Sequence, residues 1–281
     1  MYGLPEVVRF CKLCVISNQR PSSAVEFTHR LSDKKKTIGF DEDGICDACR
    51  FNIQKQHFID WNQRENDLEK LLEKHRSKKG YNVVVPGSGG KDSAYTSHIL
   101  KYKYGMNPLT VTWAPHLYTQ VGWENFQNWI HVGGLDNVLF TPNGKLHRFL
   151  TRQAFLNLLH PFQPFIVGQR LIGPLIAQKF GIDLVMYGEN QAEYGNSIDE
   201  NKDPKMDNRF FTTEDPTSVV LGGLPIKEIL NQTDFSINDF SPYLPIDTET
   251  KLNKSLEVHY LGYYLKWDPQ ACYYYAVENT G

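Results

Sequence analysis

The 281-residue sequence has no excess of either charge: 30 lysines and arginines face 32 aspartates and glutamates, so the formal net charge is −2. A protein that binds nucleic acid mainly through phosphates normally carries a basic excess, so the composition argues against that class. Hydrophobic residues make up 41% and aromatic residues 13% of the chain, which excludes a disordered protein.

Long hydrophobic runs are also missing, and we expect no secretory leader. The most apolar stretch, residues 162–180, is interrupted by three glutamines and one arginine, so it falls short of the roughly 18 apolar residues that a membrane span needs. The N-terminus carries charged residues where a signal peptide has its apolar core. We therefore expect a cytoplasmic protein that binds neither membranes nor nucleic acid.

Cysteine is absent from residues 50–271 and is concentrated near the N-terminus. Four of the five cysteines form two C-x-x-C pairs, Cys11, Cys14, Cys46 and Cys49. Two such pairs can surround a zinc ion, whereas two disulfides would require an oxidising compartment for which no leader is seen. Four protein ligands leave no open coordination position, so we predict a structural Zn²⁺ site.

Hydrophobic periodicity divides the rest of the chain. Apolar residues at helical spacing over 51–78 predict one long helix. After Gly80, expected strands at 83–85, 109–113, 137–140 and 183–187 alternate with expected helices at 91–104, 120–129, 145–159 and 171–180. This alternation predicts an α/β fold with a doubly wound parallel sheet that helices cover on both faces.

Beyond residue 201 the pattern is weaker. We expect a loop over 203–215, a short helix over 226–230 and, over 258–267, an aromatic segment that fits either a strand or a helix. The predicted domains are a zinc-binding module at 1–50, a linker helix at 51–80 and a main domain at 81–281 with a C-terminal region for substrate or partner. Because the chain stops without a tail-like composition, we expect this domain to be truncated.

A glycine-rich segment, residues 86–93 (PGSGGKDS), joins the first expected strand to the first helix of the main domain. Gly89 and Gly90 permit backbone conformations that let successive N–H groups converge, and the helix N-terminus adds its positive dipole end. The segment is therefore predicted to bind phosphate. It is not a Walker A loop, because Asp92 follows Lys91, and that same aspartate replaces the last glycine of a dinucleotide fingerprint.

The pattern S-G-G-x-D-S, formed by Ser88, Gly89, Gly90, Asp92 and Ser93, resembles the signature of the PP-loop ATPases, or N-type ATP pyrophosphatases. The resemblance implies an adenine nucleotide alpha hydrolase-like fold whose loop binds the β,γ-pyrophosphate of ATP while the α–β bond is cleaved. An aspartate that faces phosphates also implies Mg²⁺ between them. The alternative is a glycine-rich turn in an ordinary α/β domain.

A second candidate site follows the strand expected at 183–187, because ligands of open α/β sheets gather at the carboxyl ends of strands. Glu189 and Glu193 are spaced one helical turn apart and are candidates to hold a metal or a polar substrate; Asn190 and Tyr194 accompany them. The alternative is a plain helix start with glutamate near the positive dipole end.

Further motifs extend the resemblance over nearly the whole chain, to the N-acetyl sugar amidotransferases (WbpG/PseA-like proteins) of bacterial surface-polysaccharide biosynthesis, which supply sugars of LPS O-antigen and flagellin glycans. These motifs are, in order, the first C-x-x-C with Arg20-Pro21, residues 44–49 (GICDAC), the phosphate loop, residues 187–190 (YGEN) and residues 261–267 (LGYYLKW). The resemblance implies that ATP adenylylates a carboxylate or acetamido oxygen of a nucleotide-linked N-acetyl sugar, and that ammonia then replaces AMP.

The site residues follow from this assignment. The candidates for catalysis are Asp92, Ser93, Glu189 and Asn190; those for the cofactor are Ser88, Gly89, Gly90, Asp92, Ser93 and Trp113; those for the sugar substrate are Arg148, Arg152, Arg170 and Tyr194. Arginine suits carboxylate and diphosphate groups, although each of these arginines also fits a plain surface position.

The ammonia source is predicted to be external. A cysteine glutaminase needs a reactive thiol, yet residue 2 is tyrosine and Cys272 lies in a tyrosine-rich context typical of a core cysteine. The family resemblance implies a separate glutaminase subunit with a cyclase-like partner.

Two alternative functions remain. The first is a tRNA-thiolating PP-loop enzyme, which would need additional cysteines in the region 50–271, where there are none. The second is a zinc-ribbon binding protein with an inactive ATPase domain, against which the intact loop argues.

Overall fold

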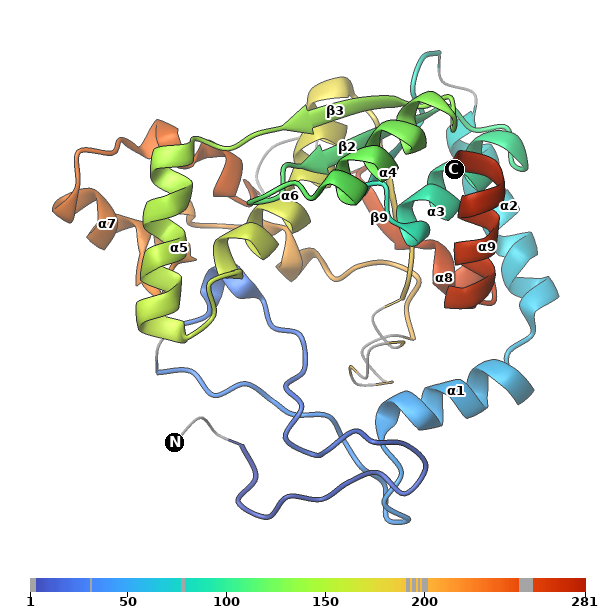
Figure 1. The fold of residues 1–281 in the computed structure, drawn as a ribbon, viewed down its shortest axis with the longest axis horizontal. Coiled ribbons are helices and arrows are strands. Elements are labelled where there is room, and N and C mark those ends of the chain that lie inside the picture. The colour runs from blue at the N-terminus through green and yellow to red at the C-terminus, as the bar shows by residue number, and fades with distance from the viewer. Residues whose placement is uncertain are drawn as a thin grey trace.

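The computed structural model describes residues 4–30, 32–76, 79–190, 193, 196, 198, 202–247 and 255–281 (Figure 1). Its centre is a five-stranded sheet with the order β3-β2-β1-β4-β9, in which every neighbouring pair is parallel. The strands are β1 Val83–Pro86, β2 Pro108–Trp113, β3 Asp136–Phe140, β4 Leu184–Tyr187 and β9 Glu257–Tyr260.

The sheet is buried on both faces because its central strands are almost wholly apolar. Side chains of a strand alternate between the two faces. In β1, Val84 packs into one hydrophobic cluster, whereas Val83 and Val85 pack into another on the opposite face. Helix α6 (Gln163–Phe180) covers the first face, and α3 (Lys91–Tyr102) covers the second. The predicted doubly wound parallel α/β fold is confirmed.

The order of the strands determines where a ligand can bind. The chain runs outward from β1 through β2 to β3, by way of α3 and α4 (Gln120–His131), and then crosses back through α5 (Gly144–Leu158) and α6 to β4, on the other side of β1. At such a switch point the connections that follow neighbouring strands diverge and leave a crevice. The loop after β1 and the segment after β4 therefore lie at the same edge of the sheet.

The helix predicted over 51–78 is instead two helices, α1 Asp47–His57 and α2 Trp61–Arg76. The break lies at residues 58–60, where the Asp60 carboxylate accepts a hydrogen bond from the backbone N–H of Gln63 and caps α2. The indole of Trp61 donates to the carbonyl of Lys55 near the end of α1. The apolar spacing continues across the break, so periodicity alone does not reveal it.

The C-terminal third contains more structure than the pattern predicted. The aromatic segment 258–267 forms both a strand, β9, and a short helix, α8 (Leu261–Tyr264), and the unpredicted helix α9 (Pro269–Thr280) packs against α3. Helix α7 (Ile226–Gln232) is present as expected, and the expected loop 203–215 contains the short strand β5 (Thr212–Thr213), which pairs with β8 (Ile246–Asp247). The remaining pair is β6 (Val220–Leu221) with β7 (Leu224–Pro225).

Within the part of the chain that the structure describes, no helix combines the length and the hydropathy needed to cross a bilayer.

Strand β9 carries a buried histidine that should make the fold sensitive to acid. His259 is 2% exposed and shares a 2.7 Å hydrogen bond between its Nδ1 and the hydroxyl of Tyr264. Burial lowers its pKa to about 4, although nearby Glu257 acts in the opposite direction. The folded state therefore holds the imidazole neutral, and stability is lost as the pH falls from about 6.5 towards 4.

We expect the melting temperature to fall between pH 7 and pH 4, and to fall less steeply in His259→Asn. The shift corresponds to roughly 3 kcal/mol of unfolding free energy, at about 1.4 kcal/mol per pKa unit. Calorimetry of both proteins across this range measures the slopes. Equal slopes would show that His259 does not control acid stability.

Candidate active site

The loop between β1 and α3 is held by the hydroxyl of Ser93. Its Oγ accepts hydrogen bonds from the backbone N–H groups of Ser88 (3.4 Å) and Gly89 (3.2 Å), and donates to the carbonyl of Gly90 (3.0 Å). Gly89 has a φ of +85°, a conformation that favours glycine. Ser93 thus folds the loop onto the first turn of α3, at the positive end of the helix.

Gly87 and Gly90 serve different purposes. A Cβ on Gly87 would lie 2.1 Å from Cβ of Ser93, so only glycine fits against the serine. Gly90 was predicted to need an unusual backbone, but its φ is −74°. It lines a cavity, and no heavy atom lies within 4 Å of where its Cβ would be. The missing side chain therefore leaves open space at the N-terminus of α3, where a phosphate can approach the backbone.

Lys91, for which the sequence predicted no role, binds the carboxylate of Asp92. Its Nζ is 2.7 and 2.6 Å from the two carboxylate oxygens of Asp92, and both side chains are partly exposed. Asp92 and Glu189 both line the cavity. Mg²⁺ is usually held by one or two carboxylates together with substrate phosphates, and this donor set fits that requirement.

The cavity has a volume of about 370 Å³, within the range of small-molecule sites. One wall is the glycine-rich loop, which contributes Pro86, Gly87, Ser88, Gly90, Asp92 and Ser93. The other walls come from α6, from the ends of β4 and β9, from residues between β4 and position 208, and from the N-terminal region; they are Ser23, Ile166, Gln169, Arg170, Tyr187, Gly188, Glu189, Asn196, Met206 and Tyr260.

Of the described residues among those predicted after β4, only Glu189 lines the cavity. Asn190 is 1% exposed and lies beneath the surface. Glu193 does not join Glu189 in the cavity wall, because the Nζ of Lys55 binds its carboxylate at 2.8 and 3.0 Å. Burial raises the pKa of Glu193, and the charge of Glu189 adds to this effect. Tyr194 lies outside the described residues.

Among the three candidate arginines, the structure brings only Arg170 to the cavity. Its guanidinium lies 5.0 Å from the ring centre of Phe210, and its Nη1 donates to the carbonyl of Ala24 at 3.3 Å. Arg148 and Arg152 are exposed on α5, which packs against α6, and neither arginine lines the cavity.

Trp113 is also placed differently from the prediction. It ends β2 but is only 3% exposed, and it packs against Phe140 and Tyr243 in the core on the α6 face. Gly168 of α6 lies so close that a Cβ there would be 2.3 Å from the indole. Trp113 is therefore a core residue beneath α6 and not part of the cavity wall.

The sequence did not predict one part of the cavity wall, which comes from the segment between the two cysteine pairs. The backbone N–H of Ser23 donates to Oδ1 of Asn196 at 3.0 Å, and Phe27 is buried in the cluster on the α6 face. The only signal in the sequence is the apolar pair Val25 and Phe27 within a polar stretch. The N-terminal region thus reaches the candidate active site.

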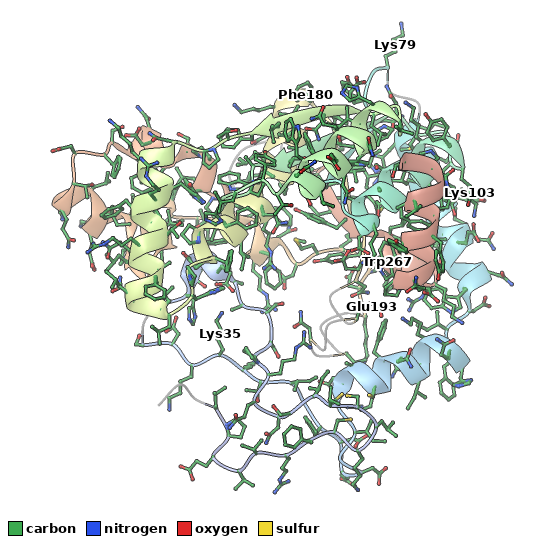
Figure 2. All side chains as sticks on the ribbon, viewed as in Figure 1. Lys35, Lys79, Lys103, Phe180, Glu193 and Trp267 are labelled. Atoms are coloured by element: carbon green, nitrogen blue, oxygen red, sulfur yellow. The ribbon has the colours of Figure 1, made fainter. Side chains whose placement is uncertain are left out.

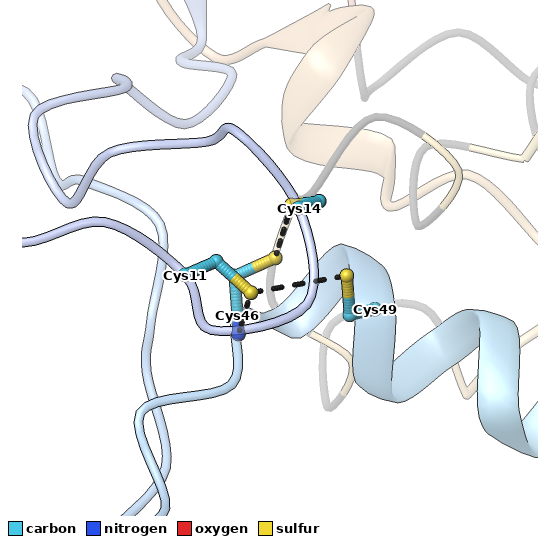
Figure 3. A group of neighbouring side chains, drawn as sticks. All are labelled: Cys11, Cys14, Cys46 and Cys49. Atoms are coloured by element: carbon cyan, nitrogen blue, oxygen red, sulfur yellow. Dashed lines mark hydrogen bonds between the residues drawn. The ribbon is translucent and has the colours of Figure 1, made fainter.

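The four N-terminal cysteines converge as predicted (Figure 3). The Sγ atoms of Cys11 and Cys49 are 3.9 Å apart and those of Cys14 and Cys46 are 3.7 Å apart, too far for disulfide bonds. A zinc tetrahedron with Zn–S bonds of about 2.3 Å has S–S edges of roughly 3.8 Å. The donor set therefore fits a tetrahedral metal ion.

One cysteine is prepared for the thiolate form that a metal requires. Burial alone would raise the pKa of Cys11, but backbone N–H groups, including those of Cys46 (3.3 Å) and Leu13 (3.4 Å), point at its sulfur and lower the pKa to about 6. Such N–H to sulfur bonds stabilise negative charge on the ligand. Burial instead raises the pKa values of Cys46 and Cys49, so a bound cation would have to favour their thiolate forms.

No protein-family model and no curated protein matches the chain. Among solved structures, similar chains include an NH3-dependent NAD synthetase from Campylobacter jejuni, with 18% identity and a TM-score of 0.38 over 48% of this chain and 59% of that one. Another is an NMN synthetase from Francisella tularensis, with 17% identity and a TM-score of 0.35 over 47% and 56%. This chain therefore spans less than two thirds of either protein, and similarity at this level does not transfer an activity.

Proposed function

We propose that this protein is an ATP-dependent amidotransferase. It adenylylates a carboxylate, or an acetamido oxygen, of a nucleotide-linked N-acetyl sugar and replaces AMP with ammonia, in the synthesis of bacterial surface-polysaccharide sugars. The observation that carries the proposal is the shared cavity, in which the glycine-rich loop faces Arg170 and Glu189. The cavity thus combines a loop that can bind phosphates with an arginine, Arg170, that can bind an anionic acceptor. This combination suits the transfer of an adenylyl group from ATP to the acceptor.

The loop residues stabilise the charge that develops on the phosphates. The N-terminus of α3 and the backbone at Gly90 face the cavity, where the outer phosphates of ATP would bind. Ser93 keeps the loop in shape through its three hydrogen bonds. Asp92 and Glu189 would hold Mg²⁺, which when bound neutralises phosphate charge. Lys91 can then release Asp92 and turn to a phosphate oxygen.

Arg170 orients the acceptor. A guanidinium can bind a carboxylate or diphosphate through two parallel hydrogen bonds, and this places the acceptor oxygen against the α-phosphorus. That oxygen attacks the α-phosphorus, and pyrophosphate leaves with the electrons of the α–β bond. Ammonia then attacks the activated carbon, a proton is lost from nitrogen, and AMP departs with the acceptor oxygen. The product is an amide from a carboxylate or an amidine from an acetamido group.

Ammonia is proposed to come from a separate glutaminase subunit with a cyclase-like partner. Cys272 is 2% exposed, and burial raises the pKa of its thiol to about 12, which suppresses nucleophilic reactivity. The other four cysteines form the metal cluster. These observations support an external ammonia source.

The proposal is tested by incubating UDP- and CMP-linked sugars with ATP, Mg²⁺ and an ammonium salt. For one acceptor we expect AMP and pyrophosphate together with a product lighter by about 1 Da, since NH₂ replaces OH; mass spectrometry detects both. Asp92→Asn should reduce turnover by about 100-fold or more, because the Mg²⁺ that would neutralise the phosphates loses a charged ligand. Release of ADP and orthophosphate would contradict the proposal.

Arg170→Met is expected to raise KM for the acceptor by roughly 10- to 100-fold while the Kd for ATP changes little, because charge-assisted hydrogen bonds to the acceptor are lost. Arg148→Met and Arg152→Met are matched controls, because both arginines lie outside the cavity. Steady-state kinetics and calorimetric titration provide the two constants. Equal KM values in all three variants would remove Arg170 from the acceptor site.

The alternative functions make different predictions in the same assays. A tRNA-thiolating enzyme would transfer sulfur to tRNA, although no cysteine lies among the described residues that line the cavity. A binding protein with an inactive ATPase domain would show no ATP–pyrophosphate exchange with any acceptor.

A further inference from the structure

Lys55 is the one lysine that is buried among the described residues, at 6% exposure. It lies on α1, six residues after the metal-cluster residue Cys49. Its ammonium donates to both carboxylate oxygens of Glu193 (3.0 and 2.8 Å) and to the carbonyl of Trp267 (3.0 Å). An ammonium group has three N–H donors, so this set accounts for all of them.

The partners of Lys55 come from two separate parts of the main domain. Glu193 follows β4, four residues after Glu189, and Trp267 lies between α8 and α9. Figure 2 shows both residues where the main domain faces α1. Lys55 is therefore a three-way contact between the helix that carries Cys49, the segment that leaves β4 and the C-terminal helices.

A second contact connects the same segment to the N-terminal region. Asn196 is 5% exposed, and its Oδ1 accepts a hydrogen bond from the backbone N–H of Ser23, which lines the cavity. Ser23 precedes the second cysteine pair in the sequence and Lys55 follows it. Two residues after β4 are thus held by two segments on either side of Cys46 and Cys49.

The metal cluster determines the direction in which α1 leaves it. Cys46 is the residue before α1 and Cys49 lies in its first turn. At a rise of about 1.5 Å per residue, Lys55 projects roughly 9 Å further along the axis. A buried ion pair whose donors are all satisfied tolerates little displacement. The orientation of α1 is therefore transmitted to Glu193.

We propose that the N-terminal metal module positions Glu189 at the cavity through the contact of Lys55 with Glu193, four residues further along the chain. Lys55 is a positioning residue, since it does not line the cavity. The expected effect of Lys55 on turnover rests on the proposed function, whereas its expected effect on amide hydrogen exchange over residues 186–190 does not.

The test compares Lys55→Met, Glu193→Ala and the double variant with Lys74→Met. Lys74 is the matched control, because it also reaches from a helix to a carboxylate of the sheet, Glu257, at 3.1 Å, but at the amino end of β9, away from the cavity. In Lys55→Met we expect kcat to fall at least tenfold, with bound zinc unchanged and with the Kd for ATP, measured without Mg²⁺, also unchanged. Amide hydrogen exchange over residues 186–190 should become at least tenfold faster.

Glu193→Ala should reproduce these changes, and the double variant should be no worse than either single variant, because both remove the same contact. Lys74→Met should retain wild-type kcat and exchange. Wild-type kcat and exchange in Lys55→Met would overturn the inference, and so would loss of zinc from that variant, since Lys55 would then support the metal module itself. If the wild type forms no AMP, the proposed function fails alone, and the exchange over 186–190 still decides the inference.

Discussion

Replacing Gly90 with alanine is expected to weaken ATP binding while the protein stays folded. The Cβ would project into open space in the cavity and would clash with nothing in the protein, and the φ of −74° suits alanine. The affinity for ATP should fall roughly tenfold or more, because the phosphates approach the backbone where the methyl group would lie. Isothermal titration calorimetry measures the affinity and a thermal melt measures the stability.

Gly89→Ala is the comparison that separates the phosphate site from the fold. At Gly89 the φ is +85° and a Cβ would lie 2.7 Å from the Cα of Phe126, so this variant should lose both ATP binding and several degrees of melting temperature. Gly90→Ala should lose only binding. If Gly90→Ala bound ATP like the wild type, the nucleotide would not occupy this loop, and the proposed function would have to be abandoned.

Replacing Cys46 with serine is expected to remove the metal and unfold the N-terminal module. Cys46 is 0% exposed and lies directly before α1, so a water molecule cannot take the place of its sulfur as a metal ligand. Structural zinc contributes roughly 10–16 kcal/mol to small modules, far more than residues 4–50 gain from their own small hydrophobic cluster. Elemental analysis should show about one zinc per wild-type chain and essentially none in the variant.

Cys272→Ser is the control for this experiment, because it also removes a buried thiol but one outside the cluster. It should retain the zinc, whereas Cys46→Ser should lose zinc together with the helical circular dichroism of α1, which begins directly after Cys46. Stoichiometric zinc in Cys46→Ser, or a wild-type protein purified without any metal, would contradict the structural site.

Features encoded by neighbouring residues were predictable from the sequence. The glycine-rich loop lies between a strand and a helix because the apolar run 83–85, the glycines and the helix start are contiguous. The two C-x-x-C pairs were also readable, since each pair brings its own two ligands together and only the meeting of the pairs requires the fold. Four of the five sheet strands were predicted, because parallel strands buried on both faces are nearly continuous apolar runs.

The candidate residues farther from the loop depended on helix faces, and the sequence does not determine which face meets the cavity. Arg148, Arg152 and Arg170 are chemically equivalent, but Arg170 lies on α6, which packs against β1 and so brings this arginine to the switch point. Trp113 ends a strand at the correct edge of the sheet, yet its side chain points to the face that α6 covers.

The residues of this chain thus specify, through local pattern alone, an α/β sheet, a loop suited to phosphates and four thiols that could hold a metal ion. Whether these parts work together is decided by contacts between segments that are far apart in sequence: Ser23 with Asn196, and Lys55 with Glu193. Such contacts are separated by more than 130 residues, and nothing in the spacing of one segment records which distant segment it will meet. The packing of the sheet, the helices and the metal module brings them together.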